Sequence, residues 1–238
     1  ILIKSLEKSG IKFIFGKEIT EISGEKVLAG SEEVASAKVI LLTTREADLT
    51  ALKDVKLEVS NGNVVANEKM QSSLKNVYVP GDVNGKNLLA HAAFKMGDIA
   101  ASEIVAGKSD KFNNNMIPRA IYTYPEIGSV GLTEEEAKKT YDVKVGKFNY
   151  GANGRALAHG DSSGMVKIIS DARYGEILGA HIVGPRASEL INEVSILMQS
   201  EVIVEEAIKM VFGHPTFSEA IYEAIADVEG VSVHLPKK

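Results

Sequence analysis

The order of predicted strands and helices in residues 116–238 constrains the fold of this chain more than any other feature. A strand opens this stretch, a short helix is predicted to start at Thr133, and further strands follow at residues 143–150, 165–170 and 176–183. Tyr174-Gly175 between the last two strands is a hairpin-turn signal. The long helices come afterwards, at residues 187–199, 204–211 and following Pro215. Strands followed by helices predict a mixed α+β domain on an antiparallel sheet.

Residues 1–115 predict an α/β arrangement of helices and short strands. The chain opens with an amphipathic helix that ends at Gly10. Strands are predicted after it at residues 11–15, through Ile22, and at 27–29, 38–43, 64–65 and 77–79. Apolar residues at helical spacing predict a helix over residues 88–106 that stops at Gly107. The asparagine-rich segment 108–115 is the best candidate for a linker.

Composition excludes several classes of protein. The 238 residues include no cysteine, which excludes disulfides and thiolate metal sites, and the five histidines lie too far apart for a His-rich metal site. The net charge of −5 is mild and lysines alternate with glutamates, so no basic patch suggests nucleic acid. Apolar runs are shorter than a membrane span, and no signal peptide is recognisable. We therefore expect a cytoplasmic protein with no metal, nucleic acid or membrane partner.

Residues 214–219, His-Pro-Thr-Phe-Ser-Glu, are the strongest candidate for chemistry. Proline suits the first position of a helix, which would place His214 at the N-cap and Glu219 little more than one turn in. A carboxylate there reaches back to an imidazole nitrogen, fixes its tautomer and stabilises the imidazolium, as a general acid–base histidine requires. A His-Pro helix start also occurs as plain capping, so the spacing alone leaves both interpretations open.

The same hexapeptide resembles the His-Pro-Thr-x-Ser-Glu signature of the dihydrolipoamide dehydrogenases, which are flavin disulfide reductases (class I pyridine nucleotide-disulfide oxidoreductases). Further segments resemble this family in the expected order: its flavin-contacting strand and turn at 77–83, the segment 88–91, the entrance to its dimerisation domain at 117–133, and the central hairpin of that domain at 177–185. Agreement in order over residues 77–223 is very hard to reach by chance. The chain is therefore identified as a member of this family.

The resemblance implies three parts of a larger fold. Residues 1–50 resemble the end of an NAD-binding domain, residues 51–115 the C-terminal part of an FAD-binding domain, and residues 116–238 the dimerisation (interface) domain. The family's redox-active cysteines and its Gly-x-Gly-x-x-Gly segments for FAD and NAD have no counterpart here. We interpret the chain as the C-terminal half of such an enzyme, which alone holds FAD weakly or not at all. Thr44-Arg45 replaces the family's Gly-Arg, and threonine cannot match the close backbone approach that glycine allows NAD at this turn.

The resemblance also implies site residues. Asp82 would accept a hydrogen bond from a flavin ribityl hydroxyl, although without the family it is equally a turn residue at a strand end. Asn87 is a plausible N-cap for the predicted helix over 88–106. The first amides of that helix would stabilise negative charge at the N1–C2=O edge of reduced FAD, and they belong to Leu88, Leu89, Ala90 and His91. His214 would be the acid–base group for the disulfide–dithiol of the partner subunit, with Glu219 orienting it and stabilising its charge.

The remaining histidines are expected to be structural or solvated. His181 lies within a strand pattern, which favours a structural role. His159 lies in the glycine-rich segment 151–164, predicted to be a loop, and His234 lies in the C-terminal tail. For a lone histidine in either place, a solvated surface position is the more common one.

The implied function is the C-terminal part of an enzyme that oxidises dihydrolipoyl groups through FAD with NAD. Its partners would be the lipoyl groups of 2-oxoacid dehydrogenase or glycine cleavage complexes. A glutathione-reductase-like enzyme and a cofactor-free dimerisation module are the alternatives. The hairpin at 178–185 favours the dihydrolipoamide dehydrogenases over the first of these, and a mercuric reductase would lack His214. A homodimer is expected because helices 187–199 and 204–211 carry more apolar residues than one face of a sheet needs.

Overall fold

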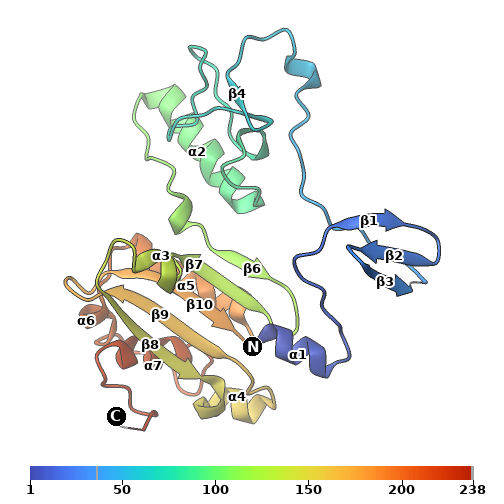
Figure 1. Ribbon diagram of the computed structural model, residues 1–238. Coiled ribbons are helices and arrows are strands. Elements are labelled where there is room, and N and C mark those ends of the chain that lie inside the picture. Colours follow the sequence, from blue (N-terminus) through green and yellow to red (C-terminus); the bar gives the residue numbers. More distant parts are fainter. Residues whose placement is uncertain (36, 237–238) are drawn as a thin grey trace. The chain divides into compact units, whose positions relative to one another are not determined.

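The computed structural model describes residues 1–35 and 37–236, which form two compact units (Figure 1). One unit is Ile3–Phe112, and the other runs from Asn113 to the C-terminal end and includes Ile1 and Leu2. The division falls inside the asparagine-rich segment 108–115. Each unit buries its own cluster of apolar side chains, as a separate domain core does.

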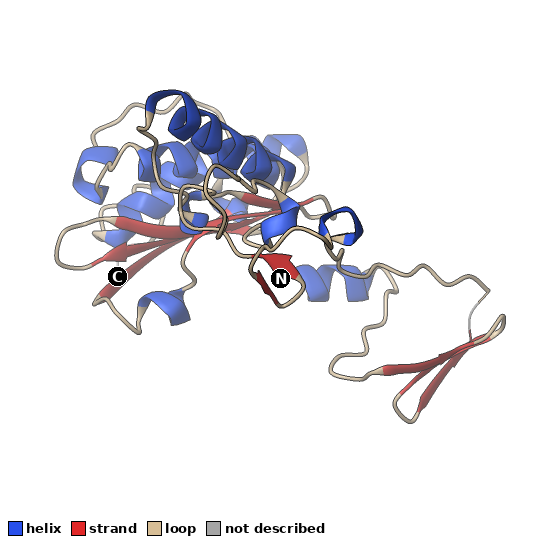
Figure 2. Ribbon diagram, turned by 90° about the horizontal axis from the view of Figure 1, so that it is seen from above, coloured by secondary structure: helices blue, strands red, loops and turns tan. Residues whose placement is uncertain are grey.

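The C-terminal unit is built on a five-stranded antiparallel sheet. Its strands lie in the order β6-β7-β10-β9-β8, with the bounds β6 (Arg119–Ile121), β7 (Ile127–Gly131), β8 (Val143–Asn149), β9 (Met165–Asp171) and β10 (Ile177–Val183). Helix α5 (Ala187–Gln199) packs on β6, β7 and β10, and α7 (Glu219–Val228) packs on β8 and β9. Both helices contribute to one buried cluster, so they cover the same face of the sheet (Figure 2). The predicted α+β domain with an antiparallel sheet is confirmed.

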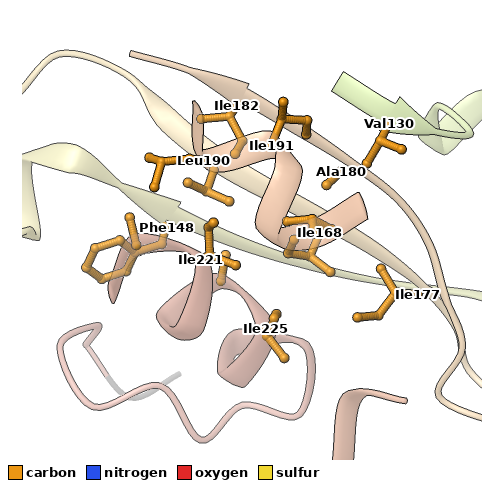
Figure 3. Close-up of a cluster of buried hydrophobic side chains, with 14 of the residues drawn as sticks. Val130, Phe148, Ile168, Ile177, Ala180, Ile182, Leu190, Ile191, Ile221 and Ile225 are labelled. Carbon is orange, nitrogen blue, oxygen red and sulfur yellow. The ribbon is translucent and has the colours of Figure 1, made fainter. Parts of the chain in front are cut away.

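The core lies between this face of the sheet and the two helices (Figure 3). Alternate residues of a strand share a face, and Ile168 of β9 and Ile182 of β10 are fully buried on the face toward the helices. From the helices, Ile191, Ile221 and Ile225 fill the opposite side of the cluster. This apolar layer fixes α7, and with it the first residue of that helix, Glu219.

Two glycines allow the helices to approach the sheet closely. A Cβ at Gly128 of β7 would collide with the carbonyl oxygen of Ala187 in α5. A Cβ at Gly146 of β8 would collide with the carbonyl oxygen of Ala224 in α7. A strand glycine at such a position marks close approach of another backbone.

The shorter elements of this unit differ from the predictions in part. A helix starts at Thr133 as predicted: it is α3 (Glu134–Ala137), and Thr133 caps it in a capping box with Glu136. The predicted loop 151–164 is wrong, because Asn153 caps helix α4 (Gly154–His159) next to η4 (Tyr150–Ala152). The helix predicted over 204–211 shortens to α6 (Val204–Ala207), because the N–H groups of Lys209 and Met210 bond to carbonyls three residues back and tighten the turn. A single turn, η3 (Asn114–Met116), precedes the sheet.

The N-terminal part begins with α1 (Leu2–Lys8) and an antiparallel meander of β1 (Ile19–Ile22), β2 (Lys26–Ala29) and β3 (Glu32–Ala35). After the meander come η1 (Thr50–Leu52), β4 (Val59–Ser60), β5 (Asn63–Val64), η2 (Asp82–Asn84) and α2 (Ala90–Ala106). Helix α2 ends at Gly107, which has a left-handed φ of 62°, as the predicted stop requires. Met96 and Ile99 lie on its buried side.

Several strands predicted in this part are wrong. Residues 11–15 and 38–43 form no strand, and the strand predicted at 77–79 reduces to one bridge between Gln71 and Tyr78. An apolar run folds as a strand only beside a partner that takes its backbone hydrogen bonds. Among the described residues no strand lies beside 38–43, where Ile40 and Leu42 are 82% and 92% exposed.

Candidate active site

The predicted contact between His214 and Glu219 is present in the C-terminal unit. His214 lies in the loop before α7, and its Nδ1 is 2.7 Å from Oε1 of Glu219, the first residue of that helix. A carboxylate can only accept here, so the bond places a proton on Nδ1 and leaves Nε2 as the acceptor of the neutral ring. The His214 side chain is 75% exposed, whereas that of Glu219 is 19% exposed. The pair thus combines a held carboxylate with an accessible imidazole.

The helix after this pair begins later than predicted. Helix α7 starts at Glu219 with Ser218 at its N-cap, and a cis peptide bond joins His214 to Pro215 in the loop before it. The predictions that His214 is an N-cap and that Pro215 opens the helix are therefore wrong. Local hydrogen bonds explain the difference, because the Thr216 N–H donates to Oε2 of Glu219 at 2.8 Å and the Thr216 hydroxyl donates to the Gly213 carbonyl at 2.7 Å. These bonds satisfy groups that a helical turn would otherwise use.

The loop that carries His214 is attached to two neighbouring elements. The side-chain amide of Asn153 donates to the carbonyl of Thr216 at 3.1 Å. The Ser218 hydroxyl donates to Oε1 of Glu193 in α5 at 2.7 Å. These bonds from outside the loop restrict its movement and so limit the positions that the imidazole can take.

The environment of Glu219 favours its ionised form. Partial burial is the largest single influence and opposes ionisation, but the Thr216 N–H and the His214 ring both donate to the carboxylate. Together these donors hold the pKa of Glu219 below its ordinary value. An anion at this position stabilises a proton on His214, which is the electrostatic requirement for an acid–base histidine.

The predicted flavin residues lie in the N-terminal unit, around η2 and the start of α2. Asp82 follows Gly81, whose φ of 88° suits glycine. Nη2 of Arg45 lies 2.8 Å from Oδ2 of Asp82, and it also donates to the carbonyl of Leu88 at 2.8 Å. The sequence predictions treated Arg45 only as part of an altered nucleotide turn and missed its contact with Asp82. Nothing local in the sequence links residues so far apart.

Asn87 does not cap α2. The N-cap is Leu89, which makes no side-chain cap bond, and the helix begins at Ala90 rather than at Leu88. The side-chain Oδ1 of Asn87 instead accepts the N–H of Leu89 at 3.0 Å, two residues further along the chain, in a local turn. Of the four predicted amides, only those of Ala90 and His91 therefore belong to the helix. The Leu89 amide is already used within the chain.

These residues fit part of a flavin site. The Asp82 carboxylate has acceptor capacity beyond its contact with Arg45, since an ionised carboxylate offers about four lone-pair sites. The start of α2 carries the partial positive charge of a helix N-terminus, which favours an anionic ligand edge. A glycine-rich cradle for a pyrophosphate is absent from the sequence. The described residues thus offer contacts for one end of the cofactor.

The other histidines occupy three different environments. His181 on β10 has its Nε2 3.2 Å from the carbonyl of Leu132, and burial lowers its pKa, which agrees with the structural role expected. His159 ends α4 with its ring edge-on to that of Phe217, at 5.7 Å between centroids. His234 is exposed, as expected, and its Nδ1 also lies 2.7 Å from Oε1 of the buried Glu223, a contact that the sequence predictions did not include. Glu223 was missed, although its position four residues after Glu219 is visible in the sequence.

Neither a metal site nor a membrane-spanning helix is present in the described residues. Within residues 1–35 and 37–236, no group of three or more His, Cys, Asp or Glu side chains could hold a metal ion. None of the helices in those ranges has the length and apolar character needed to cross a membrane.

Known families and sequences match nearly the whole chain. Residues 1–97 match the pyridine nucleotide-disulphide oxidoreductase family, and residues 117–225 match the dimerisation domain of pyridine nucleotide-disulphide oxidoreductases. The mitochondrial dihydrolipoyl dehydrogenase of Pisum sativum is 35% identical over an alignment 246 residues long, which covers 98% of this chain and 49% of that protein. The dihydrolipoyl dehydrogenase of Thermus scotoductus is 36% identical over 99% of this chain and 54% of that protein. The chain thus spans about half the length of the curated relatives it matches.

Solved structures share the fold. LpdA from Mycobacterium tuberculosis matches with a TM-score of 0.87 at 21% identity, over 95% of this chain and 51% of that one. The HOCl-induced flavoprotein disulfide reductase RclA from Escherichia coli matches with a TM-score of 0.85 at 20% identity, over 94% and 54%. At these identities the likeness concerns the fold alone. The family matches and the sequence relatives together show that the chain belongs to the pyridine nucleotide-disulphide oxidoreductases, which as a family use FAD and NAD(P), and that it is similar to dihydrolipoyl dehydrogenases.

Proposed function

We propose that this chain provides the acid–base pair and the dimer-forming domain of a dihydrolipoamide dehydrogenase, which oxidises dihydrolipoyl groups through FAD with NAD. The observation that carries the proposal is the 2.7 Å hydrogen bond between His214 and Glu219, with the rest of the imidazole exposed. Relatives named dihydrolipoyl dehydrogenase support it at 35% and 36% identity.

The proposal assigns a part of the enzyme to each region of the chain. Residues 1–50 would be the end of an NAD-binding domain, residues 51–115 the C-terminal part of an FAD-binding domain, and residues 116–238 the dimerisation domain. The family matches at 1–97 and 117–225 support the distinction between nucleotide-binding and dimerisation parts. The division of the structure after Phe112 supports a boundary in the same region.

The chain's own residues would move one proton. The Nδ1–H of neutral His214 donates to Glu219, so Nε2 takes a proton from an attacking dithiol and returns it later. The ionised Glu219 then faces an imidazolium and stabilises it. The attacking dithiol is that of the dihydrolipoyl group, and it must attack a disulfide, which it reduces. Because the chain contains no cysteine, residues outside it must supply that disulfide. We assign the disulfide to the N-terminal part of the partner subunit.

The proposed flavin contacts are Asp82 and the first turn of α2. When bound, FAD would carry electrons from the dithiol to NAD. Asp82 would accept from a ribityl hydroxyl, and the α2 amides of Ala90 and His91 would face the isoalloxazine edge that gains negative charge. The missing pyrophosphate cradle leads us to expect weak FAD binding, or none, by this chain alone.

A homodimer forms part of the proposal, although fewer apolar side chains are exposed to form its interface than the sequence indicated. Most apolar side chains of α5 and α6 are buried in the chain's own core. Ile196 of α5, and Met210 and Val211 after α6, remain exposed, with Val211 at 96%. Such apolar exposure, in a unit that matches a dimerisation domain, supports contact with a second copy. The dihydrolipoyl groups would come from 2-oxoacid dehydrogenase or glycine cleavage complexes.

A cofactor-free dimerisation module is the second candidate function. The observation that favours it is that groups of the predicted flavin site bond to each other within the chain. Arg45 forms an ion pair with Asp82, and Asn87 accepts a hydrogen bond from the Leu89 N–H. Bound oxidised flavin is yellow, so the visible spectrum of a complete protein carrying this chain distinguishes the two functions.

The direct test uses a full-length form in which this chain follows an N-terminal half that carries the redox-active disulfide. We expect that protein to bind FAD and to reduce NAD with dihydrolipoamide as the electron donor. A folded, FAD-loaded protein that does not oxidise dihydrolipoamide would contradict the proposal. Reduction of glutathione disulfide in its place would favour the glutathione-reductase-like alternative.

A further inference from the structure

Helix α7 holds a second carboxylate–imidazole pair, one turn beyond the first. Glu223 follows Glu219 by four residues, so the two side chains lie on the same face of the helix. Oε1 of Glu223 is 2.7 Å from Nδ1 of His234. Oε2 accepts the Ser232 hydroxyl and the N–H groups of Val233 and His234, the last two at 3.0 and 3.2 Å. All four donors come from the C-terminal segment 232–234.

The depth of Glu223 makes these contacts significant. Its side chain is 3% exposed, and an anion at that depth is costly unless donors replace the water it has lost. Four donors replace that water, three of them at Oε2 and one at Oε1. Burial is the largest influence and opposes ionisation, but the Ser232 hydroxyl and the ring and N–H of His234 hold the pKa of Glu223 below its ordinary value. The site therefore stabilises a charged carboxylate at a helix position where an apolar residue would be the usual choice.

We propose that Glu223 and His234 are positioning residues for the His214–Glu219 pair. They clamp segment 232–234 along the face of α7 that carries Glu219, and this attachment keeps Glu219 directed at His214. Leu235, the next residue, packs against the main core and extends the clamp. The inference rests on the proposed function of the pair, but its structural content can be measured without turnover.

Nuclear magnetic resonance of this chain with ¹⁵N-labelled histidine tests the clamp at the His214 ring. In the unmodified chain the neutral ring should be the Nδ1–H tautomer, because Nδ1 donates to Glu219. Glu223→Gln keeps the size of the side chain but removes its charge and part of its acceptor capacity. We expect the N–H groups of Val233 and His234 to exchange with solvent at least ~10-fold faster in this variant, through local opening. The neutral His214 ring should become a mixture of tautomers.

Glu229→Gln is the matched control. Glu229 directly follows α7 and pairs with Lys144 of β8 at 2.8 Å, so the same chemical change there should leave both signals unchanged. His234→Gln breaks the clamp while Glu223 stays in place. This variant replaces Glu223→Gln in the measurement if Glu223→Gln does not fold. Unchanged His214 tautomers in a folded clamp variant would overturn the proposal, and so would unchanged exchange at residues 233 and 234. The role of His214 in turnover is measured separately in the full-length form, so either inference can fail without the other.

Discussion

Nη2 of Arg45 lies 2.8 Å from Oδ2 of Asp82 and 2.8 Å from the carbonyl oxygen of Leu88. One guanidinium nitrogen thus joins the residue proposed to hold the flavin ribityl chain to the segment that leads into α2. Both side chains of the ion pair are substantially exposed, so the pair contributes only ~0–1 kcal/mol to folding. Its effect is to orient the turn rather than to stabilise the unit.

We expect the chain purified alone to leave gel filtration with well under one FAD per chain. The sequence has no Gly-x-Gly-x-x-Gly cradle for a pyrophosphate, and we expect that Asp82 with the start of α2 does not replace it. Absorbance of the protein peak in the visible range measures the flavin content. Arg45→Met is the informative companion, because it should stay as colourless as the parent. Stoichiometric yellow flavin in the parent would refute weak binding, and flavin in Arg45→Met alone would show that the guanidinium blocks the site.

In a full-length form, His214→Gln should lower dihydrolipoamide turnover by roughly 10²-fold or more, the low end of general acid–base contributions. Glutamine keeps polarity and size but cannot take the proton from the dithiol. Glu219→Gln should cost less yet remain clearly damaging, because the imidazole stays while its anionic partner is lost. His159→Gln, at the end of α4, is the matched control and should retain normal turnover. Near-normal turnover of His214→Gln would remove the catalytic assignment.

The C-terminal unit was largely predictable because its elements pair with each other. The strand pattern at 176–183 matches β10, and the helix predicted at 187–199 matches α5 to the residue. In the N-terminal part, the apolar run at 38–43 is typical of a strand but stays unpaired among the described residues. Strand formation needs a neighbour that can lie far away along the chain, so periodicity alone does not decide it.

In the candidate site, too, a contact between residues close in sequence was predictable, whereas a contact between distant residues was not. The contact between His214 and Glu219 was predictable, because five residues separate them and the donor and acceptor types match. The start of α7 was not predictable, because the Thr216 N–H donates to the Glu219 side chain instead of taking part in a helical turn. The contact of Arg45 with Asp82 depends on the folded path of the chain, which no local pattern in the sequence shows.

Gly146→Ala should destabilise the C-terminal unit by ~1–3 kcal/mol, as overpacking of a filled core does. The added Cβ would meet the carbonyl of Ala224 and the N–H of Val228, which are helix backbone and cannot move aside cheaply. Urea unfolding followed by circular dichroism measures the effect. Gly154→Ala is the control, because nothing lies within 4 Å of its Cβ position and alanine suits the helix α4. Equal stability of the two variants would contradict the close packing of α7 on β8.

The stability of the C-terminal unit should fall between pH 4.5 and about 2 in part through Glu134. Hydrogen bonds from Lys138, at 2.6 Å, and from Lys167 lower the pKa of Glu134 from 4.5 to about 2. The folded chain therefore binds this proton less readily than the unfolded chain, so the contribution is complete above pH 4.5 and is lost as the pH falls toward 2. Glu134→Gln should flatten this part of the curve of unfolding free energy against pH. Glu135→Gln, at the exposed neighbouring position, should leave the curve as steep as in the parent chain.

The C-terminal unit should form a symmetric homodimer, and Val211 offers the sharpest test of it. Val211 is 96% exposed, and exposed Met210 lies beside it in the segment between α6 and His214. A lasting two-fold interface should bury roughly 2,000 Å² or more in total. Light scattering at micromolar concentration should give twice the mass of one chain.

Val211→Lys should shift that mass toward one chain, because a charge desolvated at an apolar contact is costly. Val105→Lys replaces a similarly exposed valine of α2, in the other unit, and should leave the dimer intact. A clean monomer mass for the unmodified chain would defeat the prediction.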